Sequence, residues 1–143
     1  MKTMGQLLAS SQRVPVSVTP ATTVLDALGL MAKHDVGALL VMENDRLVGI
    51  FSERDYARKV ILRGKSSHDL QVKEIMTEKV FYTQADKTVP EAMAVLTEKH
   101  IRHLPVLDAN QRVLGVISIG DLVKETIADQ EFTIQQLVHY IAS

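Results

Sequence analysis

Apolar and polar positions follow the same order twice along the chain. Residues 23–34 and 88–99 carry apolar side chains at helical spacing, and in the first of them Val24, Leu28 and Met31 share one face. Two short apolar runs follow each helix. They are "GALLVM" and "RLVGIF" around the turn "END", then "HLPVL" and "RVLGVI" around "DANQ". The pattern predicts two buried hairpins, each placed after an amphipathic helix.

Local signals mark where these elements begin. Thr23 with Asp26, and Thr88 with Glu91, have the spacing of a capping box at a helix start. Pro105 stands inside the first run of the second hairpin. Because proline has no N–H to donate to a neighbouring strand, we expect that strand to lie at a sheet edge or to begin there.

The repetition defines the organisation of the chain. Aligning the two copies pairs Val41 with Val106 and, after one extra residue in the second turn, Gly49 with Gly115. Each copy reads strand, helix, strand, strand, helix, so we expect an α/β (α+β) fold. Its two repeats should be related by a pseudo-twofold axis, with small sheets packed against helices. The predicted division is an N-terminal segment 1–15, a first repeat 16–66, a linker 67–79, a second repeat 80–128 and a C-terminal amphipathic helix 129–143.

Composition narrows the classes of protein that fit this pattern. The 143 residues are 46% hydrophobic but only 4% aromatic, so the core must be built from Val, Leu, Ile, Ala and Met. A net charge of −1 argues against a general nucleic-acid binder. The absence of cysteine excludes disulfides and thiolate metal sites. No apolar run reaches the roughly 18 residues of a membrane span, and we expect a cytoplasmic protein.

Each hairpin ends in Ser-x-x-Asp where the last helix of its copy begins, at Ser52 with Asp55 and at Ser118 with Asp121. In one interpretation both pairs are only reciprocal helix caps. In the other, the free N–H groups of a helix start hold a phosphate while the carboxylate accepts the hydroxyls of a ribose. The residues alone leave both interpretations open.

Other candidate chemistry is weaker. His100 and His103 could form half of a metal site, but the switch from helix to strand there breaks the helical spacing, and we expect no metal. No G-x-S-x-G motif is present, and we expect no catalytic residues. A basic run is formed by Arg54, Arg58, Lys59, Arg63 and Lys65. It fits a solvated helix face, with phosphate steering or an acidic partner as the alternative.

The stretches "KHIRHLPVLDANQRVLGVISIGDLV" and "HDVGALLVMENDRLVGIFSERDYARKV" resemble the two halves of the CBS-domain pair, or Bateman module. The likeness is greatest to small stand-alone bacterial CBS proteins whose first repeat carries S-E-R-D-Y. It covers the chain except for the first dozen residues and the C-terminal helix. It implies a regulatory module, not an enzyme, that binds an adenosine-containing ligand such as AMP, ADP, ATP, NAD or S-adenosylmethionine in clefts between the repeats.

The resemblance also implies site residues. In the site of the second repeat, Asp121 would hold the ribose. The other residues of that site would be Ser118, Ile119 and Gly120 on the phosphate side, Ile101 at the adenine, Arg102 or His103 facing the phosphates, and Thr19 and Thr22. The mirror site would use Asp55, Ser52, Arg54, Val36, Gly37, Ala38, Thr83 and Asp86.

The two sites differ in residues that bear on phosphate binding. Arg54 could bind a phosphate bidentately or pair with a neighbouring carboxylate. If only one site is occupied, we favour the one with Asp121, because Gly120 allows close backbone approach. Arg102 and His103 also lie on its opposing strand.

Three functions remain. The first is a nucleotide sensor that acts through a homodimer or through a partner enzyme or transporter. The second is a structural dimerisation module whose Ser-x-x-Asp pairs are only caps. The third is a nucleic-acid or membrane-surface binder that uses the basic run, and we expect neither of those partners.

Overall fold

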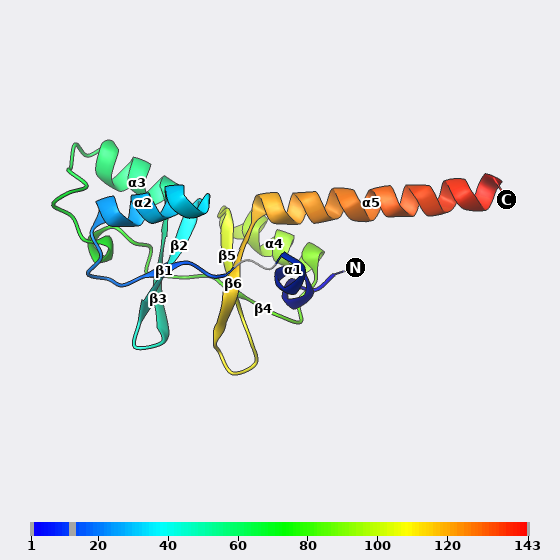
Figure 1. Cartoon of the computed structure of the whole chain (residues 1–143), viewed down its shortest axis with the longest axis horizontal. Helices are drawn as coiled ribbons and strands as arrows, with labels where there is room; N and C mark the ends of the chain where they lie inside the picture. The colour runs from blue at the N-terminus through cyan, green and yellow to red at the C-terminus, as the bar shows by residue number, and fades with distance from the viewer. Residues whose placement is uncertain (1, 12–13, 143) are drawn as a thin grey trace. The chain divides into compact units, whose positions relative to one another are not determined.

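The computed structural model describes residues 2–11 and 14–142, which form two compact units (Figure 1). One unit is residues 14–81, and the other combines residues 2–11 with residues 82–142. Each unit holds a three-stranded sheet in which a short parallel strand lies beside an antiparallel hairpin. The predicted α/β fold with two like repeats is confirmed.

The unit of residues 14–81 has the strand order β1-β2-β3. Its elements are β1 (Ser17–Val18), α2 (Val24–His34), β2 (Ala38–Glu43), β3 (Arg46–Ser52), α3 (Glu53–Tyr56), the single π-helical turn η1 (Ala57–Ile61) and the 3-10 turn η2 (Val72–Glu74). The hairpin predicted around "END" is present. Asn44 and Asp45 take positive φ values of 51° and 62° there, which suits the twist of a two-residue hairpin turn.

The second unit has the strand order β4-β5-β6. Its elements are α1 (Met4–Ser11), β4 (Thr83–Gln84), α4 (Val89–Lys99), β5 (His103–Leu107), β6 (Val113–Ser118) and α5 (Ile119–Ala142). We expected a separate C-terminal helix, but α5 runs through without a break because neither glycine nor proline occurs between Asp121 and Ala142. Within the parts of the chain that the structure describes, no helix is both long and apolar enough to span a bilayer.

The prediction for Pro105 was wrong. Pro105 is the third residue of β5, which is the middle strand of its sheet and not an edge strand. The equivalent residue in the other unit, Leu40, donates its N–H to the Val16 carbonyl on the β1 side and not to β3. Proline therefore removes only a bond on the β4 side, where β4 begins at Thr83 and pairs with Val106 and Leu107, so the hairpin ladder is kept.

Matching caps bound α2 and α4. The Thr23 hydroxyl accepts from Asp26 N at 3.1 Å, and the Thr88 hydroxyl accepts from Glu91 N at 3.4 Å. The Glu91 carboxylate accepts in return from Thr88 Oγ1 and N, and these bonds lower the pKa of Glu91. Both predicted helix starts are thus confirmed. Each helix ends at a non-glycine residue in the left-handed region, Asp35 with φ 52° and His100 with φ 54°.

The end of α2 allows a stability test. Asp35 holds a positive φ that glycine adopts without strain, so Asp35→Gly is expected to raise the free energy of unfolding by about 0.5 to 1 kcal/mol. The matched control is Ala32→Gly, which places glycine inside the same helix and should lower the free energy of unfolding by about 1 kcal/mol. Urea denaturation of the full chain measures both. Two changes of the same sign would contradict the role assigned to the left-handed cap.

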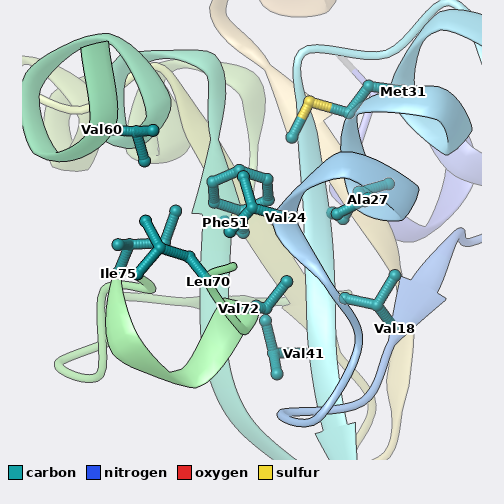
Figure 2. Close-up of a cluster of buried hydrophobic side chains, with 11 residues drawn as sticks. Val18, Val24, Ala27, Met31, Val41, Phe51, Val60, Leu70, Val72 and Ile75 are labelled. Carbon is teal, nitrogen blue, oxygen red and sulfur yellow. The ribbon is translucent and has the colours of Figure 1, made fainter. Parts of the chain in front are cut away.

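The core of residues 14–81 includes part of the segment that we predicted as a linker. Figure 2 shows Phe51 among buried side chains from β1, α2, β2 and η1, with Leu70, Val72 and Ile75 beside it. The core of the other unit is formed by Met4, Leu7, Val89, Ala92, Leu96, Leu104, Val106, Leu107, Ile117 and Leu122. Each sheet is therefore covered by its helices and by one additional segment.

These additional segments make the same backbone contacts. Val72 N donates to Thr22 O at 2.8 Å, just as Met4 N donates to Lys87 O at 2.8 Å, and Thr22 and Lys87 are equivalent positions of the two repeats. The next residue of each segment donates to the carbonyl two residues earlier, Lys73 to Pro20 and Gly5 to Ala85. Residues 2–11 therefore play in one unit the part that residues 70–77 play in the other.

Each hairpin has a glycine at the same aligned position, and the additional segment of its unit packs against that glycine. A Cβ on Gly49 would lie 2.6 Å from the Met76 sulfur, and a Cβ on Gly115 would lie 3.0 Å from Leu8 Cδ2. A side chain at either position would force Met76 or Leu8 of the covering segment to move aside. The repeated glycines that aligned the two copies therefore serve packing, not turn formation.

Candidate functional site

Both Ser-x-x-Asp pairs are reciprocal helix caps. Asp55 N donates to Ser52 Oγ at 3.2 Å, and Ser52 N donates to Asp55 Oδ2 at 3.0 Å. At the start of α5, Asp121 N donates to Ser118 Oγ at 3.1 Å, and Ser118 N donates to Asp121 Oδ2 at 2.8 Å. The predicted reciprocal caps are therefore present at both positions. A cap of this kind occupies one carboxylate oxygen and does not by itself exclude a ligand at the other.

Asp55 is engaged by its own unit beyond the cap. Its Oδ1 accepts from Thr77 Oγ1 at 3.0 Å and lies 3.0 Å from the Lys59 ammonium, which also donates to Ile75 O at 3.0 Å. The Ser52 hydroxyl lies 3.1 Å from Oδ2. With the residue only 8% exposed, both carboxylate oxygens of Asp55 serve the fold. A ribose at Asp55 would have to displace these donors.

Asp121 has different neighbours, because the residues that hold Asp55 are not repeated. The position of Lys59 is taken in α5 by Glu125, whose Oε2 lies 3.6 Å from the Lys2 ammonium. Thr77 reaches Asp55 because its segment is hydrogen-bonded along β3, whereas α1 stays helical to Ser11. A glutamate is not a cation, so Glu125 cannot form with Asp121 the ion pair that Lys59 forms with Asp55.

The residue just before each hairpin is hydrogen-bonded to the first residue of the helix that follows the hairpin. Gly37 O accepts from Glu53 N at 3.1 Å, and Arg102 O accepts from Ile119 N at 2.9 Å. In register, Ala38 lies opposite Ser52, and His103 lies opposite Ser118. One end of the β4–β6 sheet thus brings together the predicted residues Ile101, Arg102, His103, Ser118, Ile119, Gly120 and Asp121. The matching end of the β1–β3 sheet brings together Val36, Gly37, Ala38, Ser52, Arg54 and Asp55.

The other four predicted residues lie in turns and strands of the opposite repeat. Thr19 and Thr22 form the turn after β1, with their hydroxyl oxygens 3.1 Å apart. Thr83 is buried in β4, and Asp86 is exposed just after it. Thr19 and Thr22 belong to the unit of residues 14–81, and Thr83 and Asp86 to the other. Their share in the predicted sites stays a prediction.

An open cavity of about 490 Å³ lies within the unit of residues 14–81, between α2 and α3. Its lining is Leu28, Met31, Ala32, Asp35, Val36, Gly37, Glu53 and Tyr56. It includes the predicted residues Val36 and Gly37 but not Asp55, and the two charged side chains in its lining are carboxylates. A phosphate would be repelled there, so we do not assign the nucleotide to this cavity.

The remaining candidates have structural explanations. Lys59, taken from the basic run, pairs with Asp55, while Arg58, Arg63 and Lys65 are exposed. His100 follows the last residue of α4 and His103 begins β5, so the predicted switch from helix to strand is present. In residues 2–11 and 14–142, no cluster of three or more histidine and acidic side chains could hold a metal ion.

Sequence reasoning missed the roles of Lys59 and Thr77. The spacing of Asp55 and Lys59 by four residues on a helix was a usable signal for the ion pair. Thr77 gave no such signal, because its contact with Asp55 depends on how the segment after η2 packs against β3.

Comparison with known proteins identifies the family. The CBS domain matches residues 9–62 and 72–127, so the chain belongs to the CBS-domain proteins and carries a tandem pair of these domains. It is 40% identical over 128 residues to the mitochondrial CBS domain-containing protein CBSX3 of Arabidopsis thaliana, covering 86% of this chain and 62% of that protein. The chain thus spans about three fifths of the length of that relative.

Two solved structures extend the comparison. A protein with CBS domains from Burkholderia ambifaria MC40-6 is 49% identical, with a TM-score of 0.84 over 90% of this chain and 96% of that one. The CBS domain protein PAE2072 of Pyrobaculum aerophilum is 26% identical, with a TM-score of 0.75 over 83% of this chain and 88% of that one. The structure of the Pyrobaculum protein is a complex with AMP.

Proposed function

We propose that the protein is a regulatory module that binds an adenosyl ligand at Ser118 and Asp121 and performs no catalysis. The candidate ligands are AMP, ADP, ATP, NAD and S-adenosylmethionine. Ligand binding would shift an equilibrium between two arrangements of the protein. That shift would act through a homodimer or on a partner enzyme or transporter. Location in the cytoplasm stays a prediction.

One observation carries the choice of site. Asp55 is held by Lys59 and Thr77 at 3.0 Å each, whereas the position of Lys59 is taken at Asp121 by Glu125. Asp55 therefore serves the fold, and Asp121 is the carboxylate better suited to accept the two hydroxyls of a ribose. The AMP complex of the Pyrobaculum relative supports an adenosyl ligand.

The surroundings of Asp121 also suit the phosphate of a nucleotide. The site lies at the start of α5, a helix of 24 residues whose first N–H groups carry partial positive charge. Arg102 and His103 come from the strand opposite Ser118 and can add positive charge. Gly120 has no side chain to keep a phosphate from the backbone.

The test is thermal unfolding of the full chain with each of the five ligands. A ligand at one hundred times its Kd stabilises the folded state by about 2.7 kcal/mol, which corresponds to a shift in Tm on the order of 5 to 10 °C. Asp121→Ala should abolish that shift. Asp129→Ala, an exposed carboxylate on the same helix, is the matched control and should keep it.

The outcomes separate the proposal from its alternatives. A shift that survives in Asp121→Ala and disappears in Asp55→Ala would move the site to the first repeat. If no ligand shifts Tm at millimolar concentration, the Ser-x-x-Asp pairs are caps only, and the protein is a structural dimerisation module. Salt-sensitive binding to DNA or to anionic vesicles would instead favour the basic run as the functional surface.

A further inference from the structure

The C-terminal part of α5 exposes many large apolar side chains. Every residue from 127 to 142 is exposed, and Figure 1 shows this part of α5, in orange and red, extending beyond the sheet of its own unit. The exposed apolar residues of α5 after its first turn are Val123, Ile127, Phe132, Ile134, Leu137, Val138, Tyr140 and Ile141. Most of the stability of a helix in a protein comes from packing of its apolar face, so exposed apolar side chains in this number indicate a surface that binds a partner.

Most of these residues follow a heptad pattern. Ile127, Ile134 and Ile141 are seven residues apart, and Val123 and Leu137 fall on a second series with Gln130 between them. The steps alternate between four and three residues, which gives the average of about 3.5 that marks a coiled-coil seam. We call these six residues the α5 seam. Phe132 lies on the opposite face of the helix.

The α5 seam is distinct from the face that α5 uses within its own unit. Leu122 is buried there and Thr126 is half-buried, whereas the seam residues Val123 and Ile127 are exposed beside them. The seam therefore begins alongside the folded unit and continues along the helix beyond it. All six seam residues are exposed.

We propose that the α5 seam pairs with the same seam of a second copy of this chain, in a parallel two-stranded coiled coil. Isoleucine at the first series of positions with leucine at the second, as at Leu137, is the combination that favours two parallel strands. The flanking positions also agree, because Lys124 and Glu131 would face Ile119 and Thr126 of the other copy, and no like charges meet.

Gln130 fixes the direction and register of the pairing. In a parallel pair Gln130 meets Gln130, and the two amides can hydrogen-bond to one another. In an antiparallel pair overlapping from Val123 to Ile141, Gln130 would face Ile134 and bury an amide against an apolar side chain. A single polar residue in a seam is a known means of specifying register at some cost in stability.

This inference rests on the homodimer of the proposed function and gives it a surface. Its test requires no nucleotide, so its failure would leave ligand binding at Asp121 untouched. Sedimentation equilibrium of the full chain measures dimerisation. Ile134→Lys places two ammonium groups in the seam and should weaken the dimer by about a hundredfold or more.

Phe132→Lys provides the matched control. Phe132 and Ile134 are 61% and 58% exposed, so neither substitution disturbs the folded core, and circular dichroism should show the same melting of both units. Phe132→Lys should leave the dimer intact. A wild-type chain that is still monomeric at a protein concentration of about 0.1 mM would overturn the proposal. An Ile134→Lys variant that dimerises like the wild type would do so as well.

Disulfide trapping tests the direction of the pairing. The chain has no cysteine, so a single introduced thiol can bond only to the same position of a second copy. Ile141→Cys should cross-link under mild oxidation, because the two seam positions of a parallel pair approach within the about 4.4 to 6.8 Å between Cα atoms that a disulfide spans. His139→Cys, on the outer face, should not. Failure of Ile141→Cys to cross-link, or equal cross-linking of the two variants, overturns the parallel arrangement.

Discussion

Phe51→Ala is expected to lower the free energy of unfolding of residues 14–81 by about 3 to 5 kcal/mol. Phe51 is fully buried in β3, and Figure 2 shows its ring among side chains from α2, η1 and the segment around η2. Its removal leaves a cavity that all of these elements line, because each is held in place by backbone hydrogen bonds. A domain of this size is stable by only about 5 to 15 kcal/mol, so this single change removes a large share.

Urea denaturation followed by circular dichroism measures the loss. Phe51→Leu keeps most of the volume and should cost about 1.5 kcal/mol. Phe132→Ala removes the same side chain from an exposed position of α5 and should change the free energy of unfolding by less than about 0.5 kcal/mol. Equal losses for Phe51→Ala and Phe132→Ala would show that the ring of Phe51 is not the centre of this core.

Asp55→Ala is expected to lower the free energy of unfolding by about 2 to 3 kcal/mol. It removes the cap of α3, worth about 1 kcal/mol, and leaves the Thr77 hydroxyl and the Lys59 ammonium without their acceptor. The Lys59 side chain is 34% exposed and can turn to water, so the loss stays below the about 3 to 5 kcal/mol of a fully buried pair.

Asp121→Ala is the matched comparison, because it removes the equivalent cap. Loss of that cap should cost about 1 kcal/mol. Thr77→Val separates the hydroxyl contact from the rest and should cost about 1 kcal/mol. If Asp55→Ala and Asp121→Ala are equally destabilising, the two carboxylates play the same structural role, and the basis for choosing between the two sites disappears. Ligand shifts for each variant must be measured from its own Tm.

The features predicted from sequence were those fixed by neighbouring residues. The hairpin around Asn44 and Asp45, the caps at Thr23 and Thr88, and both Ser-x-x-Asp pairs depend on contacts within about four residues, so local patterns reveal them. The candidate residues Arg102 and Ser118 were brought to one end of a sheet for the same reason. A hairpin followed directly by a capped helix leaves little freedom in where they lie.

The errors and omissions involve contacts between distant segments. The prediction that Pro105 lies at a sheet edge considered only the missing N–H of proline. The cost of that missing hydrogen bond depends on which side of β5 has no strand opposite Pro105. The Thr77 contact that engages Asp55 comes from a segment whose sequence gives no hint of it. The likeness between residues 2–11 and residues 70–77 was not found from the sequence, although the buried Met4 and Leu7 correspond to the buried Val72 and Ile75.

The place of α1 in the fold has a consequence for how the chain folds during synthesis. The segment 2–11 is synthesised before residues 14–81, but its partners Ala85 and Lys87 follow only after that whole unit has been made. Residues 14–81 can close on themselves as they emerge, since the segment that completes them follows directly. The other unit depends on a contact of high sequence separation, which slows folding. The segment 2–11 therefore waits for residues that follow more than 70 positions later before it reaches its native position, and until then Met4 and Leu7 remain exposed to water.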